Sequence, residues 1–284
     1  MKGSNSMLIA VFYVLLCSFF VLFGWLFGLD QANFASVWTY LLLLADFILS
    51  YILAFVSVLG ITSILGEFRK KKQFDNKFNH YFAQSLLRLA LHLARIKTVV
   101  TGLENIPKDN KFIFVCNHQE NFDIPVLSPI FKGHPMCFIA KEALFKAPII
   151  GKWINLLGNV PIGKNADRDA AKSIIMGIKR HKEGLPFGIF PEGMRARSNE
   201  MIEFKPGAFK LAMKPKSNIL IGTIYDMGKI FKSIPWKRYV VRVHFHPLLP
   251  YQEYKELNSQ EISANVKAII QSKLDEFNKK SPQV

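Results

Sequence analysis

The chain has 284 residues, half of them hydrophobic, and its 37 Lys and Arg against 21 Asp and Glu give a formal net charge of +16. This excess favours an anionic partner, either a nucleic acid or an anionic lipid surface, although a solvated soluble surface would also carry it. The sequence has no zinc-finger pattern or ribonucleoprotein motif, and its three cysteines form no C-x-x-C pair, which argues against a nucleic-acid module, a disulfide framework and a zinc site.

Two apolar segments open the chain. Residues 7–28 carry no charge, and at about 1.5 Å per residue they match the roughly 30 Å hydrocarbon core of a bilayer. The second segment, 39–66, carries Asp46 as its only charge. The first segment also has the position of a signal peptide, but it lacks an obvious small-x-small cleavage site and a second span follows at once. We therefore predict a membrane anchor, residues 1–72, with transmembrane helices at about 7–28 and 39–66.

Basic residues around these segments predict their orientation. Lys2 precedes the first segment, the run RKKK at 69–72 follows the second, and the loop between them carries Asp30 but no Lys or Arg. The positive-inside rule therefore places both ends in the cytoplasm. The domain 73–284 is then predicted to be cytoplasmic, with the anchor in the cell inner membrane. Asp46 is expected near the outer interface, so we assign it no function.

The rest of the chain alternates between strand-like and helix-like segments. Residues 73–95 show apolar side chains at helical spacing, which suits a helix lying on the membrane as well as one packing on a domain core. Expected strands are 96–101, 111–116, 136–140, 160–162, 187–190, 218–225 and 239–245. Expected helices are 148–157, 167–183 and 263–279. This alternation predicts an α/β domain with a mostly parallel sheet flanked by helices.

Polar residues follow the expected strand 111–116 directly. Asn117 and His118 come first, and Asp123 lies five positions after His118. Catalytic groups in open α/β sheets lie beyond the carboxyl ends of strands. A bend there would turn Asp123 back toward the imidazole, fixing its tautomer and making it a better base for a hydroxyl that attacks an ester or thioester. Asp123 would equally serve as the cap of a following helix.

Two further segments end in polar residues. The expected strand 187–190 runs into Glu192, Gly193 and Arg195, and an arginine there suits bidentate binding of phosphate. The alternative is a surface turn with an ordinary salt bridge. The expected strand 160–162 leads to Lys164, which could share the phosphate with Arg195 or be one of many surface lysines.

Together, these blocks resemble the motifs of the glycerolipid acyltransferases, especially the 1-acyl-glycerol-3-phosphate acyltransferases. The resemblance runs from about 102 to 250. The family motif N-H-x4-D is matched at 117–123, and F-P-E-G-T-R is matched at 190–195 with Met194 in place of Thr. A third stretch, F-K-x-G-A-F, is matched at 204–209.

The sequence departs from the family pattern at two places. Lys164 stands where the second motif usually ends in Arg, so the charge is kept but the bidentate fork is lost. Arg168 could compensate. In the fourth motif, Gly222 and Thr223 stand where a Pro usually follows the apolar strand. These departures bear on phosphate geometry and acceptor choice more than on acyl transfer.

The resemblance implies transfer of an acyl chain from acyl-CoA or acyl-carrier protein to the sn-2 hydroxyl of membrane-embedded lysophosphatidic acid, which makes phosphatidic acid. His118, oriented by Asp123, would take the hydroxyl proton, and the oxygen would attack the thioester directly. Backbone N–H groups would stabilise the resulting oxyanion. The phosphate would lie on Arg195 and Lys164, while Glu192 would contact the glycerol or shape its loop. No covalent acyl-enzyme, cofactor or metal is expected. The full set expected to bind substrate is Asn117, Lys164, Glu192, Gly193 and Arg195.

Three alternatives remain open from the sequence. The acceptor could be glycerol-3-phosphate or another lysophospholipid. The chain could be a non-catalytic membrane protein that binds lipid on the same scaffold, although such a module has no need of a base–carboxylate pair. It could also be a lipid hydrolase that uses water where an acyltransferase uses an alcohol.

Overall fold

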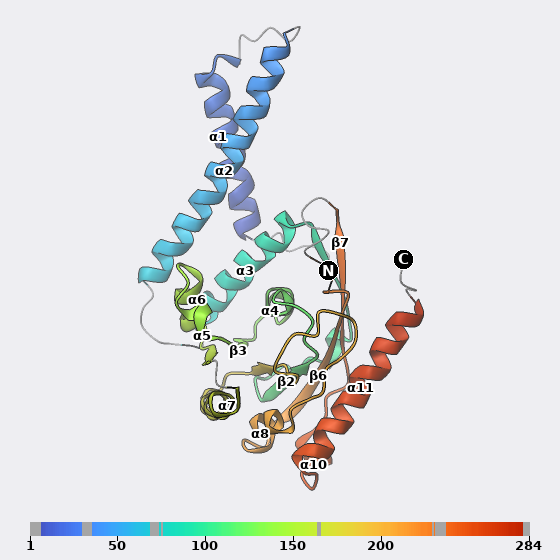
Figure 1. Ribbon diagram of the computed structural model, residues 1–284. Helices are drawn as coiled ribbons and strands as arrows, with labels where there is room; N and C mark the ends of the chain where they lie inside the picture. Colours follow the sequence, from blue (N-terminus) through green and yellow to red (C-terminus); the bar gives the residue numbers. More distant parts are fainter. Residues whose placement is uncertain are drawn as a thin grey trace. The chain divides into compact units, whose positions relative to one another are not determined.

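The computed structural model of the chain describes residues 7–29, 36–68, 74, 76–163, 166–228, 230 and 237–280. The chain divides into two compact units, Met1–Lys71 and Lys72–Val284 (Figure 1). The first unit contains two long helices and the second contains the sheet and the remaining helices.

The first unit is a pair of apolar helices, α1 (Met7–Leu26) and α2 (Val37–Phe68). Both are long and apolar enough to cross a bilayer, with mean hydropathies of 2.6 and 2.4. Their bounds lie within two residues of the two expected spans. Asp46 of α2 is buried, and its carboxylate accepts a hydrogen bond of 3.1 Å from the Ser50 hydroxyl. A Cβ atom at Gly24 of α1 would lie 3.5 Å from Asp46 Oδ2, which is an ordinary van der Waals contact.

The second unit is built on a seven-stranded sheet with the order β1–β7–β6–β2–β5–β3–β4. Neighbouring strands are parallel except for the antiparallel pair β6 and β7. The strands are β1 (Ile96–Thr101), β2 (Phe112–Cys116), β3 (Cys137–Lys141), β4 (Val160–Ile162), β5 (Phe187–Ile189), β6 (Asn218–Tyr225) and β7 (Tyr239–Phe245). The predicted α/β class and mostly parallel sheet are therefore confirmed.

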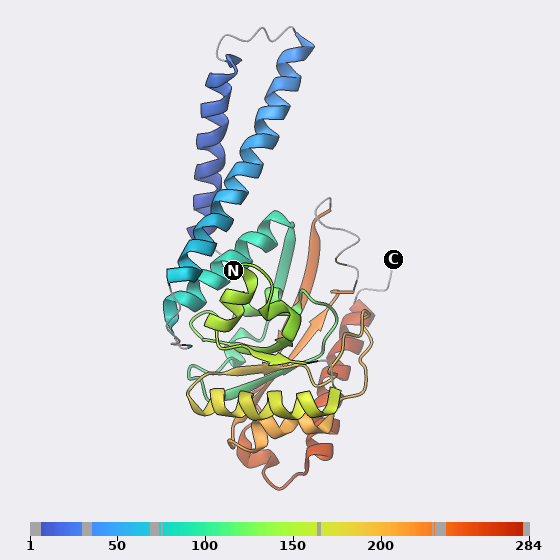
Figure 2. The same ribbon diagram turned by 60° about the vertical axis from the view of Figure 1, so that its left-hand side comes forward.

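Helices cover both faces of this sheet (Figure 2). One face carries α7 (Ala166–Lys182), α8 (Lys210–Met213) and α11 (Ser259–Lys280), and the other carries α3 (Lys77–Leu93) and α4 (Asp123–Leu127). The shorter helices are α5 (Glu142–Phe145), α6 (Ile150–Leu156) and α10 (Tyr251–Tyr254). Trp153 of α6 stacks on Phe82 of α3 with ring centroids 4.9 Å apart, so α6 lies on the α3 side.

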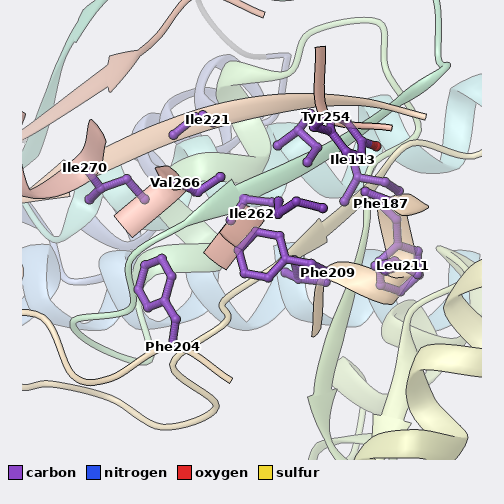
Figure 3. Packing of buried hydrophobic residues seen from close by; sticks show 14 of the residues in the cluster. Ile113, Phe187, Phe204, Phe209, Leu211, Ile221, Tyr254, Ile262, Val266 and Ile270 are labelled. Carbon is purple, nitrogen blue, oxygen red and sulfur yellow. The ribbon is translucent and has the colours of Figure 1, made fainter. Parts of the chain in front are cut away.

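The central strand β2 shows why both faces are covered. Successive side chains of a strand point to opposite faces, and here Ile113 and Val115 enter one core cluster while Phe112 and Phe114 enter the other. Figure 3 shows the first cluster, in which Ile113 and Phe187 of the sheet pack near side chains of α8 and α11. Every residue of β2 is buried. Helices cover both faces of the sheet at β2, and the polar residues that follow this strand lie at its carboxyl end.

One departure from the family pattern has a packing explanation. Gly222 lies inside β6, where it pairs with Cys116 and Phe245. A Cβ atom at this position would lie 2.5 Å from Cε2 of the Phe114 ring. The large ring on β2 therefore requires glycine here, and the strand continues without interruption to Tyr225.

Candidate active site

The centre of the site is the turn between β2 and α4. His118 follows the strand by two residues, and Asp123 is the first residue of α4. The bend brings the His118 Nδ1 to 2.7 Å from Asp123 Oδ2. Because a carboxylate only accepts, Nδ1 carries the hydrogen and Nε2 is left as the basic nitrogen. The imidazole is 19% exposed while the carboxylate is fully buried, so only the base can meet a substrate.

Asp123 is held by the backbone of its own turn. The Gln119 N–H donates to Oδ2 at 2.7 Å, and the Glu120 N–H donates to both oxygens at 3.1 Å. Burial raises the pKa of Asp123 above its ordinary value, and the bond to His118 and the two backbone amides oppose that rise. The carboxylate therefore both orients the imidazole and closes the turn. It does not cap α4, because the N-cap residue is Phe122 and this helix start has no side-chain cap hydrogen bond.

An aromatic ring packs against one face of the His118 imidazole. Phe190, which follows β5, stacks on His118 with centroids 4.3 Å apart and planes inclined by 19°. Phe138 of β3 in turn stacks on Phe190 at 6.3 Å. The stack limits rotation of the His118 ring, and its π face suits the imidazolium that forms when the base takes a proton.

Glu192 is buried and holds two loops together. Its Oε1 accepts from the His118 N–H at 2.9 Å, and its Oε2 accepts from the Ile202 N–H at 3.2 Å. Burial raises the pKa of Glu192 to about 7, against the lowering effect of these two amides. With 1% of its surface exposed, this side chain favours the loop-shaping role over contact with the glycerol.

Arg195 lies beside the turn that carries His118 and Asp123. Its Nη1 is 3.7 Å from Oε2 of Glu120, and the next residue, Ala196, donates its N–H to the His118 carbonyl at 2.8 Å. The guanidinium is 21% exposed, so it is open to an anion. Gly193 turns the chain toward Arg195 with φ of 69°, a conformation that favours glycine.

Asn117 faces the sheet. Its Nδ2 donates to the Ile224 carbonyl and its Oδ1 accepts from the Ile224 N–H, both at 2.9 Å. The side chain thereby extends the pairing of β2 with β6 by one residue. Because its oxygen and nitrogen are both used and 1% of the residue is exposed, the geometry supports a positioning role more than contact with substrate.

Lys164, the second residue expected to bind the phosphate, lies outside the residues that the structure describes. Arg168, named as its possible substitute, is an exposed residue of α7. The strand before Lys164, β4, is parallel to β3 and lies at one edge of the sheet. Its carboxyl end therefore points the same way as those of β2 and β5.

Sequence reasoning missed two residues of the turn, Gln119 and Glu120. Gln119 Oε1 accepts from the Met227 N–H at 2.8 Å, and its Nε2 donates to Asn199 Oδ1 at 3.1 Å. Glu120 holds Arg195, as described above. Both occupy unspecified positions of the N-H-x4-D motif, so nothing in a single sequence distinguishes them. Their contacts join residues more than seventy positions apart, which only the fold reveals.

The arrangement can perform one kind of chemistry well. It presents an oriented imidazole beside a partly exposed guanidinium, at the carboxyl ends of parallel strands in a sheet covered on both faces. The base can take a proton from a hydroxyl while the guanidinium binds an anionic group on the same molecule. This combination suits attack by the hydroxyl of a phosphate-bearing substrate.

Comparisons with known proteins show the family of the chain. A family model described as Acyltransferase matches residues 97–226. The 1-acyl-sn-glycerol-3-phosphate acyltransferase of Borreliella burgdorferi is 31% identical over 194 residues, which are 68% of this chain and 77% of that protein. The Escherichia coli protein of the same name is 27% identical over 59% of this chain and 68% of its own length. The chloroplastic protein BAT2 of Brassica napus is 31% identical, with 57% of this chain and 46% of its own length covered.

A solved structure has the same fold. The crystal structure of the 1-acyl-sn-glycerophosphate (LPA) acyltransferase PlsC from Thermotoga maritima superposes with a TM-score of 0.64. The match covers 79% of this chain and 92% of that one at 24% sequence identity.

Proposed function

This chain belongs to the acyltransferase family, among the 1-acyl-sn-glycerol-3-phosphate acyltransferases, and from that premise we propose that it converts lysophosphatidic acid to phosphatidic acid. The acyl chain comes from a thioester of coenzyme A or of acyl-carrier protein. One observation supports the mechanism above all others: the 2.7 Å hydrogen bond between His118 and Asp123 at the carboxyl end of β2.

In the proposed reaction, His118 Nε2 takes the proton of the sn-2 hydroxyl as its oxygen attacks the thioester carbonyl. The C–S bond breaks and the thiol leaves, taking up the proton that the imidazolium carries. Asp123 accepts from Nδ1 throughout and stabilises the imidazolium. The attack is direct, so no acyl-enzyme forms.

The acceptor is held by its phosphate. Arg195 is the partly exposed cation beside the base, and it exchanges its 3.7 Å contact with Glu120 for the phosphate oxygens. Lys164 is the second phosphate ligand in this proposal. The two loops of the site are held in place by Glu192, Gly193 and Asn117. In this proposal these residues act on substrate binding through the loops, without contacting the substrate.

Membrane association follows from the two apolar helices. We propose that α1 and α2 span the cell inner membrane with both ends in the cytoplasm, as the basic residues around them indicate. The second unit is then a cytoplasmic catalytic domain, which receives the lipid acceptor from the membrane and the donor from solution.

The test is a product assay with the full chain in detergent or vesicles. Lysophosphatidic acid, glycerol-3-phosphate and a lysophospholipid with a larger head group are each offered with both donors. We expect phosphatidic acid from the first acceptor at the highest kcat/KM. A higher kcat/KM for another acceptor would change the assignment within the class, and release of free fatty acid without a new ester would indicate a hydrolase. Lipid binding without turnover under all conditions would indicate a non-catalytic protein.

A further inference from the structure

Exposed basic side chains gather on α7, on α8 and in the turn that follows α8. Ile175 and Met176 lie among them, and these two are 66% and 42% exposed. The two helices are in contact, and Figure 2 shows α7 and α8 side by side on one face of the sheet. We call this the α7–α8 surface. Its exposed basic residues are Arg168, Lys172, Lys179, Lys182, Lys210, Lys214 and Lys216.

The spacing on α7 makes a continuous stripe. Arg168, Lys172, Ile175, Lys179 and Lys182 follow one another at steps of three or four residues, which places them along one side of a helix. Two acidic side chains described on and just after α7 are directed elsewhere. Asp169 is half-buried beside Gly163, and Glu183 pairs with Arg180 at 3.1 Å. The stripe therefore presents positive charge to the solvent.

The opposite face of the sheet has a different surface. There α3 exposes Phe78 and Tyr81, and the short helices beside it expose Leu144 and Ile150. Surfaces that lie in the membrane interface use large aromatic and aliphatic side chains of this kind. The α7–α8 surface has no exposed aromatic residue among its described positions. An apolar centre of Ile and Met with a charged rim instead has the composition of a protein interface.

The stripe also begins near the catalytic edge of the sheet. α7 follows β4 after a short connection, and β4 ends at the same edge as β2 because β4, β3, β5 and β2 are parallel. At about 1.5 Å per residue, α7 is roughly 25 Å long. That is more basic surface than the nucleotide of coenzyme A would cover, and it suits a macromolecular donor whose thioester reaches the site from the Arg168 end.

We propose that the α7–α8 surface is the docking site for an acidic acyl-carrier protein that delivers the acyl thioester. The inference rests on the proposed function, which leaves the donor open between coenzyme A and carrier protein. Ile175 and Met176 form the centre of the interface, and the surrounding lysines and Arg168 pair with carboxylates of the carrier.

The test uses charge reversal in the full-length protein. The variant Lys172→Glu/Lys179→Glu changes two exposed residues of the stripe. The control Lys97→Glu/Lys108→Glu makes the same net change at two exposed residues, one in the edge strand β1 and one in the connection between β1 and β2. Each protein is assayed with acyl-carrier protein and with acyl-CoA that carry the same chain. Like charges across an interface oppose binding strongly, so we expect the stripe variant to raise the KM for the carrier donor at least about tenfold. Its KM for acyl-CoA and both KM values of the control stay within about twofold of wild type. A second variant, Ile175→Ser, keeps the charge and raises only the carrier KM.

Several results would overturn the inference while leaving the enzyme assignment intact. One is wild-type protein that is active with acyl-CoA but inactive with the carrier donor. The others are a stripe variant that loses activity equally with both donors, and a stripe variant whose KM for the carrier is unchanged. Weakened binding to anionic vesicles without any donor-dependent change would assign the surface to the membrane instead. Wild-type protein that makes no phosphatidic acid from either donor would reject the proposed function itself.

Discussion

The turn after β2 and the segment after β5 both follow buried strands, and each combines one partly exposed functional group with buried polar partners. In the turn, His118 is open while Asn117 and Asp123 are buried. In the segment, Arg195 is open while Glu192 is buried. The difference between the two regions is what the buried acid holds. Asp123 accepts from an imidazole as well as from two backbone amides, whereas Glu192 accepts from backbone amides alone among the described residues.

This difference predicts which substitutions change the reaction and which change stability. Loss of Asp123 should act on the reaction, because its side-chain partner is the proposed base. Loss of Glu192 should act on stability and on loop position, because its partners are N–H groups of two loops. Loss of Arg195 should act on the acceptor alone. The predictions below follow that division.

The largest of these effects is expected for Asp123→Asn. The amide keeps the size of the side chain but removes the charge that fixes the imidazole tautomer, so kcat should fall at least about 10²-fold. The KM for acceptor should change little. Asp109→Asn, at an exposed turn, is the matched control and should keep wild-type kcat. A kcat within a few-fold of wild type for Asp123→Asn would remove this carboxylate from the mechanism.

Next in size is the effect of Arg195→Ala on the acceptor. Hydrogen bonds to charged groups contribute about 1.5–3 kcal/mol, so the KM for lysophosphatidic acid should rise about 10- to 100-fold. The KM for the acyl donor should stay unchanged. Arg195→Lys should recover part of the loss, since it keeps the charge without the fork. Monoacylglycerol, which lacks the phosphate, serves as the control acceptor. An equal loss with both acceptors would show that Arg195 does not bind the phosphate.

Glu192→Gln should mainly lower stability. Its amide would place a donor against one of the two backbone N–H groups, and leaving one N–H without an acceptor costs about 1–3 kcal/mol. A drop in the thermal unfolding midpoint should report this loss. Glu256→Gln, at an exposed residue, should leave the midpoint unchanged. A midpoint for Glu192→Gln equal to that of wild type would contradict the loop-holding role.

The pH dependence of stability gives a smaller and sharper test of the same residue. Burial raises the pKa of Glu192 to about 7 from an ordinary value of 4.5. The folded protein therefore binds the proton more tightly than the unfolded chain does. Protonation of Glu192 therefore stabilises the folded state. This contribution to the free energy of unfolding is complete below about pH 4.5 and is lost as the pH rises through 7. Over this window the unfolding midpoint of Glu192→Gln should fall less than that of wild type. Parallel curves for the two proteins would contradict the raised pKa.

The local elements were predictable from sequence because their signals are local. Four strands, 96–101, 160–162, 218–225 and 239–245, have the predicted bounds, and the other three differ by at most one residue at an end. Buried apolar runs mark such strands directly. The antiparallel pairing of β6 with β7 was not predicted, because strand direction depends on how the connection between them folds. The short helices α5, α8 and α10 were also missed, since four residues carry no periodicity.

The site was predictable in part. The spacing of His118 and Asp123 indicated their pairing, and the structure brings them together at 2.7 Å. The two motifs gave no sign that Asn117 and Glu192 would face inward, because burial is set by the packing of neighbouring loops and strands. Gln119 and Phe190 contact residues distant in sequence, so their roles required the fold.

The most direct test of the whole account is the kcat of His118→Ala with lysophosphatidic acid and an acyl thioester, measured beside wild type in the same membrane preparation. General base catalysis contributes about 10²–10⁴-fold, so kcat should fall by that amount while the unfolding midpoint stays near that of wild type. A His118→Ala enzyme with near-wild-type kcat would contradict the assignment of His118 as the base.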